Sequence, residues 1–426
     1  MSSSTSRSTT GGRSAFARLR SRAAVSAAKL ATTASRATGR GAGGMIGGLV
    51  AGVIDPNILE GLAGRPTILV TGTNGKSTTT GMLAAALRTK YTVATNDGGD
   101  NMDAGIISAL LADGEASHVV LEVDELHVPA IADRLKPEAL VLLNLSRDQL
   151  DRVGEINAIE RALRGCVEKH PEMTVIANCD DVLMTSVALD APNVVWVSAG
   201  AGWLGDSVSN PRGAGHIVRD EDDWYATTGD FRRPSPDWAV TDEGLTGPDG
   251  TYPLELTLPG RANRGNAAQA VAAAVEAFGV DVDAAIAATE SIDDVAGRYT
   301  TITVGDHHAR LLLAKNPAGW QEALSMVDRD ADGLVIAVNG QQGDGEDLSW
   351  LWDVKFEDFE GMSVKAAGER GTDLAVRLLY AGIDHELIHD PVKAIQACPP
   401  GRVEVLANYT ALLNLKNALT KESARG

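Results

Sequence analysis

The stretch TGTNGKSTTT, Thr71 to Thr80, decides the fold of this chain. It follows the apolar run RPTILV (65–70) and precedes the alanine-rich run GMLAAALRTK (81–90), which predicts a strand, a tight turn and a helix in that order. Gly72 and Gly75 let such a turn bring backbone N–H groups against phosphate oxygens. The N-terminus of the following helix adds a partial positive charge at the same point. The stretch therefore predicts a phosphate-binding loop in an α/β fold.

Three side chains of this loop suit a nucleoside triphosphate with Mg²⁺. Lys76 can reach the β- and γ-phosphates, and the hydroxyl of Ser77 or Thr78 can ligate the metal. Val70 stands where the first glycine of the full G-x-x-x-x-G-K-[ST] pattern belongs, so the loop departs from that pattern at one position. Glycine followed by lysine and hydroxyl residues, between a strand and a helix, still favours nucleotide binding over an ordinary βα turn.

Charge is distributed unevenly along the 426 residues. The net charge of −19 argues against broad nucleic-acid binding. The first 54 residues nevertheless contain no acid, so a net charge of −27 remains on the rest of the chain. The eight basic residues of this N-terminal segment are Arg7, Arg13, Arg18, Arg20, Arg22, Lys29, Arg36 and Arg40.

Three interpretations of the N-terminal segment stay open. It resembles an organelle transit peptide, it suits a basic, partly helical arm that rests on anionic lipid, and it suits an unstructured tail leading into a packed helix. No apolar run approaches the ~20 residues that a membrane-spanning helix requires. The three cysteines indicate a reducing cytosol without a disulfide framework, so we expect a cytoplasmic protein; they are Cys166, Cys179 and Cys398. A lipid-binding N-terminal arm would bring it to the inner face of the plasma membrane.

Strand and helix patterns alternate through most of the chain. Strands are predicted near residues 67, 91, 118, 139 and 174, with helices between them, which favours a parallel sheet. Residues 15–37 have helical character, and GRGAGGMIGGLVAG (39–52) suggests a glycine-rich link. Between about 200 and 257 the composition predicts hairpins, and a second α/β segment begins near Tyr299.

Carboxylates and amides follow two of the predicted strands. LEVDE (121–125) places Glu122, with Asp124 or Glu125 near it, where it can hold Mg²⁺ at the carboxyl end of a strand. The next strand leads into NLSRDQLDRVGE (144–155), whose polar side chains suit metal or phosphate contacts; they are Asn144, Asp148, Gln149 and Asp151.

Five segments together resemble the Mur ligase superfamily in order and spacing. They are TGTNGKSTTT, EVDE, NLSRDQLDRVGE, LPGRANRGNAAQAVAAA (258–274) and AGRYT (296–300). The resemblance implies an α/β fold with a Mur ligase-type central P-loop ATPase domain, a hairpin-rich insertion and a smaller α/β C-terminal domain. We expect residues 1–54 to form a basic N-terminal arm and helix, 55–297 the ATP-binding domain with a ribbon-like insertion at 200–257, and 298–426 the C-terminal domain.

The resemblance also assigns roles to individual residues. Enzymes of this superfamily phosphorylate a carboxylate with ATP and let an amine attack the acyl phosphate. Ser77 and Glu122 would hold Mg²⁺. The residues expected to contact the nucleotide are Thr73, Asn74, Gly75, Lys76, Ser77, Thr78, Asn263, Asn266, Arg298 and Lys315.

Within the superfamily the chain resembles the MurT family most. Gln149 replaces a histidine found in many amino-acid-adding members, while LLLAKNPAGWQEAL (311–324) and VNGQQGDGEDLSWLWDVKFE (338–357) look like MurT segments. That resemblance implies ATP-dependent amidation of the D-isoglutamate α-carboxyl of lipid II, with ammonia from a GatD-type glutaminase as partner. It makes Asp347 the expected catalytic residue, with Asp344 and Asp353 as the alternatives. A stand-alone ligase of the folylpolyglutamate type and a nucleotide-binding scaffold without catalysis stay open as other functions.

The insertion departs from the MurT pattern at four positions. MurT proteins commonly carry a four-cysteine zinc ribbon there. In this chain no cysteine stands at the four positions, so none of them can bind zinc as a thiolate. We therefore expect ATP and Mg²⁺ but no zinc, and hairpins that persist by packing alone through Trp224, Phe231, Pro234 and Trp238. The four positions are occupied by Asn210, Gly213, Ala226 and Gly229.

Overall fold

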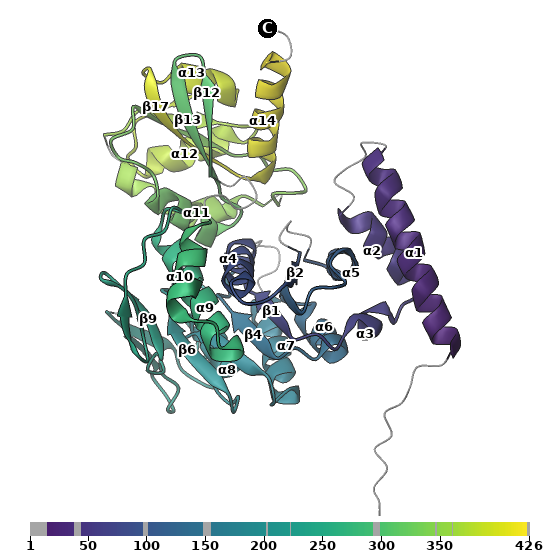
Figure 1. Cartoon of the computed structure of the whole chain (residues 1–426). Helices are drawn as coiled ribbons and strands as arrows, with labels where there is room; N and C mark the ends of the chain where they lie inside the picture. Colours follow the sequence, from purple (N-terminus) through teal and green to yellow (C-terminus); the bar gives the residue numbers. More distant parts are fainter. Residues whose placement is uncertain are drawn as a thin grey trace, which may run out of the picture.

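The computed structural model places two large β-sheets in separate parts of the chain, with helices around each of them (Figure 1). The structure describes residues 15–37, 44–96, 101–147, 155–201, 203–221, 223–292, 299–345, 347–359 and 361–423. Arg298 lies outside these ranges, as do Asp148, Gln149 and Asp151.

The larger sheet has nine strands in the order β11-β10-β9-β6-β5-β4-β1-β3-β2. The strands from β2 to β9 in this order are parallel, whereas β9, β10 and β11 pair antiparallel. The predicted strands near 67, 91, 118, 139 and 174 are confirmed as β1 to β5. The strands are β1 (Thr67–Thr71), β2 (Val93–Thr95), β3 (His118–Glu122), β4 (Ala139–Leu142), β5 (Thr174–Asn178), β6 (Val194–Ser198), β9 (Trp238–Thr241), β10 (Gly244–Gly247) and β11 (Gly250–Tyr252).

Helices cover both faces of this sheet, and its central strands are therefore buried on both sides. Ile68 and Val70 pack against one group of helices, and Leu69 between them packs against the other, as alternation along a strand requires. The first group is α4 (Lys76–Arg88), α9 (Arg261–Phe278) and α10 (Val282–Glu290). The second is α3 (Ile58–Leu62), α5 (Asp103–Ala112), α6 (Val128–Leu135), α7 (Glu155–Lys169) and α8 (Val182–Ala188).

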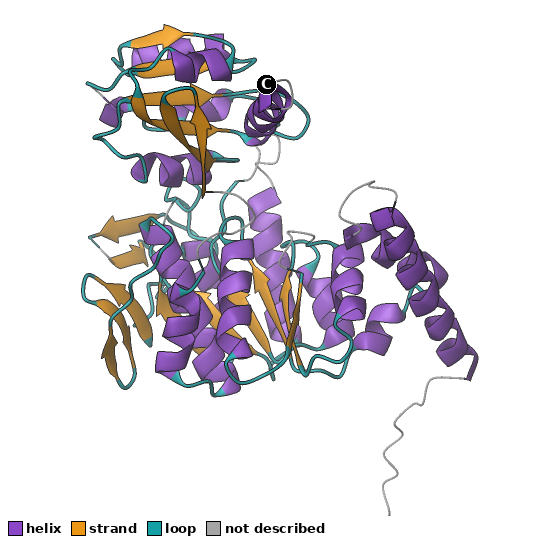
Figure 2. Ribbon diagram, turned by 45° about the horizontal axis from the view of Figure 1, so that its top comes forward, coloured by secondary structure: helices purple, strands orange, loops and turns teal. Residues whose placement is uncertain are grey.

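Two N-terminal helices form an edge of the molecule beside α5 (Figures 1 and 2). The helix predicted at 15–37 is confirmed as α1 (Ala15–Ala37). The glycine-rich link predicted at 39–52 is wrong from Gly44 onward, because α2 (Gly44–Ile54) is helical; residues 39–43 lie outside the described ranges. Gly48 explains the difference: a Cβ there would collide with the backbone of Ala104 in α5, so tertiary packing outweighs the low helix propensity of glycine.

The predicted hairpins of the insertion fall into two sets. β7 (Ile217–Asp220) and β8 (Asp223–Ala226) form a separate two-stranded sheet. By contrast, β9 to β11 extend the main sheet, because β9 pairs with β6 through Val197 and Trp238. Part of the insertion is therefore continuous with the larger sheet.

The smaller sheet has six strands in the order β12-β13-β17-β14-β15-β16. Only the β12–β13 pair is antiparallel. The strands are β12 (Tyr299–Val304), β13 (His307–Leu313), β14 (Gly333–Ala337), β15 (Val364–Ala367), β16 (His385–Leu387) and β17 (Gly401–Ala407). The helices are α11 (Pro317–Ser325), α12 (Gly371–Tyr380), α13 (Pro391–Gln396) and α14 (Tyr409–Ser423), with 3₁₀ turns η2 (Ser349–Trp352) and η3 (Glu357–Phe359).

Candidate active site

The loop between β1 and α4 has the backbone shape that the sequence predicts. Gly75 precedes α4 in the left-handed region, with φ of 85°. A Cβ at this position would lie 2.5 Å from Oδ1 of Asn266, and one at Gly72, whose φ is 145°, would lie 2.8 Å from Cβ of Leu143. Both positions therefore require glycine, for conformation and for space. The backbone N–H groups at the start of α4 remain suitably placed for an anion.

Hydrogen bonds attach this loop to the end of β4. The side chain of Asn144 accepts a hydrogen bond from Asn74 N at 3.0 Å and donates one to Asn74 O at 2.9 Å. Thr73 Oγ1 donates to Ser146 O at 3.0 Å and accepts from Ser146 N at 2.9 Å. Asn144 thus orients the phosphate-binding loop, a role more specific than the metal or phosphate contact that the sequence predicts for it.

The amine of Lys76 is held inside the site. Its Nζ donates to Gly72 O at 2.6 Å and lies 3.4 Å from Oε1 of Glu125. Burial raises the pKa of Glu125, and the positive charge of Lys76 only partly offsets this effect. The lysine therefore has a carboxylate partner that phosphate oxygens can replace when a nucleotide binds.

Glu122 ends β3 beside the loop, where Val70 is its partner in the sheet. The side chain of Asn96 fixes its backbone through two hydrogen bonds of 2.8 Å, and Asn101 Nδ2 donates to its Oε1 at 3.1 Å. Oε2 is buried and has no hydrogen-bond partner among the described residues. A buried carboxylate oxygen without a donor suits a cation, and Ser77, buried in the first turn of α4, offers a hydroxyl. These residues fit Mg²⁺.

Two expected nucleotide contacts lie at the start of α9. Asn263 Nδ2 donates to Pro259 O at 2.6 Å, and Asn266 Nδ2 lies 3.4 Å from Oδ1 of Asn263. The side chain of Asn266 lies directly against Gly75. The helix α9 therefore brings both amides next to the phosphate-binding loop. Arg298, the other residue predicted for this side, lies outside the described residues.

The C-terminal part of the chain reaches the loop through a pair of amides. Asn74 Nδ2 donates to Asn316 Oδ1, and Asn316 Nδ2 donates to Asn74 Oδ1, both at 3.3 Å. Lys315, the preceding residue, has its Nζ 5.6 Å from the centre of the Tyr409 ring. The expected contact of Lys315 with the nucleotide stays a prediction, but the chain next to it meets the loop directly.

Asp347 lines a surface hollow of about 430 Å³ with Trp352 and Arg370. Its Oδ1 accepts a hydrogen bond from Ser349 N at 2.8 Å, and hydrogen bonds from the backbone and side chain of Ser349 lower the pKa of this exposed carboxyl. Asp347 is therefore an accessible carboxylate at neutral pH.

The two alternative aspartates are occupied by other contacts. Asp344 is buried and accepts hydrogen bonds from the backbone and hydroxyl of Thr410, at the start of α14. Asp353 Oδ2 lies 3.5 Å from Nη2 of Arg147, whose Nε lies 2.5 Å from Asp206 in the insertion. Asp344 is buried, and Asp353, although exposed, is paired with Arg147. Among the described residues this leaves Asp347 as the exposed aspartate of the three without an ion pair.

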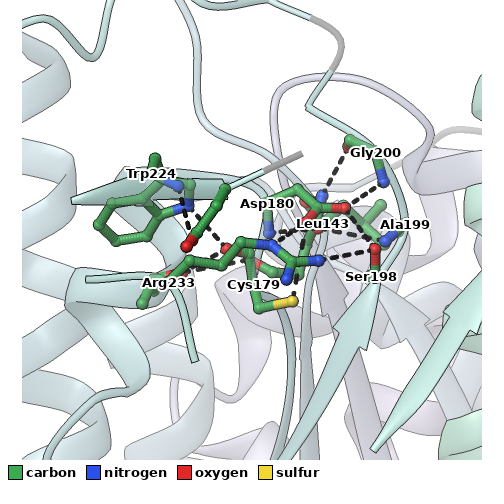
Figure 3. A network of polar contacts seen from close by, with 11 residues as sticks. Leu143, Cys179, Asp180, Ser198, Ala199, Gly200, Trp224 and Arg233 are labelled. Carbon is green, nitrogen blue, oxygen red and sulfur yellow. Dashed lines mark hydrogen bonds and ion pairs between the residues drawn. The ribbon is translucent and has the colours of Figure 1, made fainter. Parts of the chain in front are cut away.

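The insertion is held by polar contacts as well as by packing, so the expectation of packing alone is wrong. Trp224, Phe231 and Ile217 form an apolar cluster with Val182. Asp180 lies at the centre of a hydrogen-bond network next to Trp224 (Figure 3).

Arg233 closes this network. Its Nε lies 2.7 Å from Oδ1 of Asp180, whose Oδ2 accepts from Gly200 N at 2.6 Å and Ser198 Oγ at 3.0 Å. Trp224 Nε1 donates to Cys179 O at 3.0 Å. Burial raises the pKa of the Cys179 thiol to about 12, so it stays protonated.

Asn210 adds a second polar element at one of the positions where the ribbon would have cysteine. Its Oδ1 accepts from Arg212 N at 3.0 Å, and its Nδ2 donates to Ala214 O at 3.1 Å. The asparagine side chain thus closes the turn by hydrogen bonds. Among the residues that the structure describes, no group of three or more His, Cys, Asp or Glu side chains is arranged to hold a metal ion.

The structure brings most of the predicted nucleotide residues to one edge of the larger sheet. Sequence reasoning missed the amides that orient them, because an asparagine in a loop carries no local signal of its distant partner. The only available signal was position, since Asn96 and Asn101 follow β2 just as Asn144 follows β4. The missed amides are Asn96, Asn101 and Asn316. The contacts of Arg147 with Asp206 and Asp353 were missed as well.

Comparison with known proteins agrees with this geometry. Residues 70–274 match the Mur ligase middle domain, and residues 313–412 match the MurT ligase C-terminal family. The MurT subunit of lipid II isoglutaminyl synthase (glutamine-hydrolyzing) from Streptococcus pneumoniae R6 is 30% identical over 402 residues, which cover 86% of this chain and 90% of that protein. This chain belongs to the MurT family of Mur ligases.

More distant MurT and Mur ligase relatives support the same assignment. The Staphylococcus aureus COL subunit of the same name is 27% identical over 95% of this chain and 98% of its own length. Among solved structures, MurF from Acinetobacter baumannii gives a TM-score of 0.66 at 18% identity, covering 87% of this chain and 80% of that one. Folylpolyglutamate synthase from Mycobacterium tuberculosis, solved with ADP and AMPPCP, gives 0.55 at 16% identity. These structures show that the MurT-family chain has the Mur ligase fold.

Proposed function

We propose that this chain is the synthetase subunit of a lipid II isoglutaminyl synthase. It would amidate the α-carboxyl of D-isoglutamate in the lipid II stem peptide, using ATP and ammonia from a GatD-type glutaminase. The observation that carries the proposal is the match to a MurT subunit along 90% of that protein. We take residues 55–297 as the ATP-binding unit and 298–426 as the unit that carries Asp347.

The first step would transfer the γ-phosphoryl group of ATP to the substrate carboxylate. A carboxylate is a poor electrophile, and the resulting acyl phosphate has a good leaving group. Lys76 and the N–H groups that follow Gly75 are suited to hold the phosphates and stabilise the charge that develops on them. Ser77 and Glu122 would hold Mg²⁺, which neutralises phosphate charge when bound.

The second step would be attack of ammonia on the carbonyl carbon, with release of phosphate. Ammonia arrives mostly protonated at neutral pH unless it is delivered in a sheltered form, so a nearby carboxylate is useful to orient it or to take a proton. Asp347 suits this role, because its carboxyl is exposed and its pKa is held low by the hydrogen bonds from Ser349.

Location follows from the proposed substrate. Lipid II belongs to the membrane, and no helix in the described ranges is long and apolar enough to span one. We therefore propose a cytoplasmic enzyme that works at the inner face of the plasma membrane, with a glutaminase and not a nucleic acid as its partner.

Reconstitution tests the proposal directly. The purified chain, MgATP, lipid II and either a GatD-type glutaminase with glutamine or ammonium chloride should convert one carboxyl of the stem peptide to a carboxamide, detected by mass spectrometry. Asp347→Asn should bind MgATP normally but form no amide. Asp306→Asn, in an exposed turn between β12 and β13, is the matched control and should remain active. Amide formation by Asp347→Asn would move the role elsewhere, and failure of the wild type with both ammonia sources would refute the function.

A further inference from the structure

The helices α1 and α2 form an edge of the molecule (Figures 1 and 2). Exposed apolar side chains form a stripe along α2. Leu49 is 54% exposed and Val53 82% exposed, and Met45 and Ile46 are exposed on the same helix. Spacing of three to four residues places these side chains on one face. The stripe therefore presents a continuous apolar surface to the surroundings.

Packing against the body fixes the orientation of this stripe. The opposite face of α2 carries Gly47 and Gly48, which lie against α1 and α5, and Gly48 N donates to Ser108 Oγ at 2.7 Å. Because a Cβ at either glycine would collide with a neighbour, α2 cannot rotate to bury its apolar face. Leu49 and Val53 consequently point outward in the folded protein.

The outward face of α1 carries positive charge together with apolar side chains. Leu19 and Leu30 are 66% and 73% exposed, and Arg22 and Lys29 are exposed at intermediate positions of the same face. Arg20 instead lies 2.8 Å from the buried carboxylate of Asp55, which attaches α1 to the body. The edge thus combines leucine and cationic side chains on a helix whose position is fixed.

We propose that the edge formed by α1 and α2 is a docking surface for an anionic lipid bilayer. A helix that lies in the interface needs apolar side chains on one face and basic side chains beside them, and both are present here. The charge distribution selects an anionic partner: the first 54 residues carry eight basic side chains and no acid, whereas the rest carries −27 and would be repelled. A bilayer can therefore approach this edge favourably and is repelled from the body.

Vesicle co-sedimentation of the full chain tests the proposal. The wild type should bind vesicles made of equal parts phosphatidylglycerol and phosphatidylcholine, and should bind pure phosphatidylcholine much more weakly. Each basic residue near an anionic surface contributes about a fivefold gain in binding. Arg22→Gln with Lys29→Gln should therefore lower binding about 25-fold. Leu49→Asp with Val53→Asp should lower it at least about tenfold, since the apolar contact is replaced by charge.

Matched variants on other surfaces separate docking from general effects. Arg232→Gln with Lys136→Gln removes two exposed cations from the body, and Val376→Asp with Leu379→Asp alters two exposed apolar residues of α12. Both should bind vesicles like the wild type. Thermal unfolding checks that every variant is folded. As a test without substitution, about 0.5 M NaCl should weaken wild-type binding, because screening shortens the reach of the charges.

Three results would overturn the proposal. The first is equal sedimentation of the wild type with anionic and neutral vesicles. The second is equal loss of binding in the edge variants and in the matched variants. The third is a dimer of the wild type that the α2 variants convert to a monomer, which would make the stripe a self-association surface. None of these measurements depends on amidation, so the outcome is independent of the proposed reaction.

Discussion

Replacing Arg233 with methionine should destabilise the insertion strongly. The guanidinium lies 2.7 Å from Asp180, and the two side chains are only 15% and 12% exposed. Methionine keeps the apolar stem of the side chain but leaves a largely buried carboxylate without its cation. In the network of Figure 3 the carboxylate of Asp180 would then keep its contacts from Ser198 Oγ, Gly200 N and, at 3.8 Å, Cys179 Sγ.

The size of the effect follows from the burial of the pair. Removing one partner of a fully buried ion pair costs about 3–5 kcal/mol. Neutral donors from Ser198, Gly200 and Cys179 remain on the Asp180 carboxylate and some water can reach it, so we expect a loss of about 2–3 kcal/mol. For a cooperative unit of the size of the larger sheet and its helices, that loss corresponds to a decrease in Tm of roughly 5–10 °C.

Thermal unfolding by circular dichroism measures this effect, and hydrogen exchange of the β7 and β8 amides locates it. Arg232→Met is the matched control, because this neighbouring arginine is exposed, and its Tm should stay within about 1 °C of the wild type. We expect the ion pair of Arg233 and Asp180, and not a zinc ion, to hold the insertion together. EDTA should therefore leave the wild-type Tm unchanged. The reasoning is refuted if Arg233→Met melts with the wild type, or if EDTA lowers the wild-type Tm by a similar amount.

Three further changes test the site itself. Gly75→Ala should weaken MgATP binding at least about tenfold in calorimetry, because the new Cβ meets Asn266 and φ is positive, whereas Gly81→Ala, with open space around it on α4, should bind normally. Glu125→Gln should raise the Tm of the nucleotide-free chain at pH 8 more than at pH 5: a carboxyl with a raised folded pKa stabilises at low pH and loses that contribution as pH rises, and equal shifts would contradict this. Asn316→Ala removes the two hydrogen bonds with Asn74, which together contribute about 1–2 kcal/mol, and should increase the radius of gyration in solution scattering. An unchanged radius would argue against a link between the part with the larger sheet and the part with the smaller sheet.

Local patterns explain what could be predicted from the sequence. Short apolar runs ended by Gly, Asp or Asn predict β1 to β5, and the GKS motif predicts the turn before α4, because each depends on neighbouring residues alone. The order of strands at the carboxyl edge then places Glu122 in register with Val70, just before the loop that leads to Lys76. These features required no knowledge of distant contacts.

The remaining features depend on contacts between distant residues. The amides of Asn74 and Asn316 are 242 residues apart, and neither position has a local signal for the pairing. The helix α2 was missed because glycines lower local propensity, while their small size is what the packing against α5 requires. Likewise, the pairing of β9 with β6 is a long-range register that composition cannot reveal.

The paired amides of Asn74 and Asn316 have a thermodynamic consequence. Asn74 belongs to the phosphate-binding loop, and its partner belongs to the chain that carries the C-terminal sheet. If a bound nucleotide favours one geometry of the loop, it also strengthens or weakens the hydrogen bonds between Asn74 and Asn316. Binding equilibria are reciprocal: if nucleotide changes the affinity of a partner for the C-terminal part by some factor, that partner changes the affinity for nucleotide by the same factor. A companion protein bound far from the phosphates could thereby set how tightly ATP is retained.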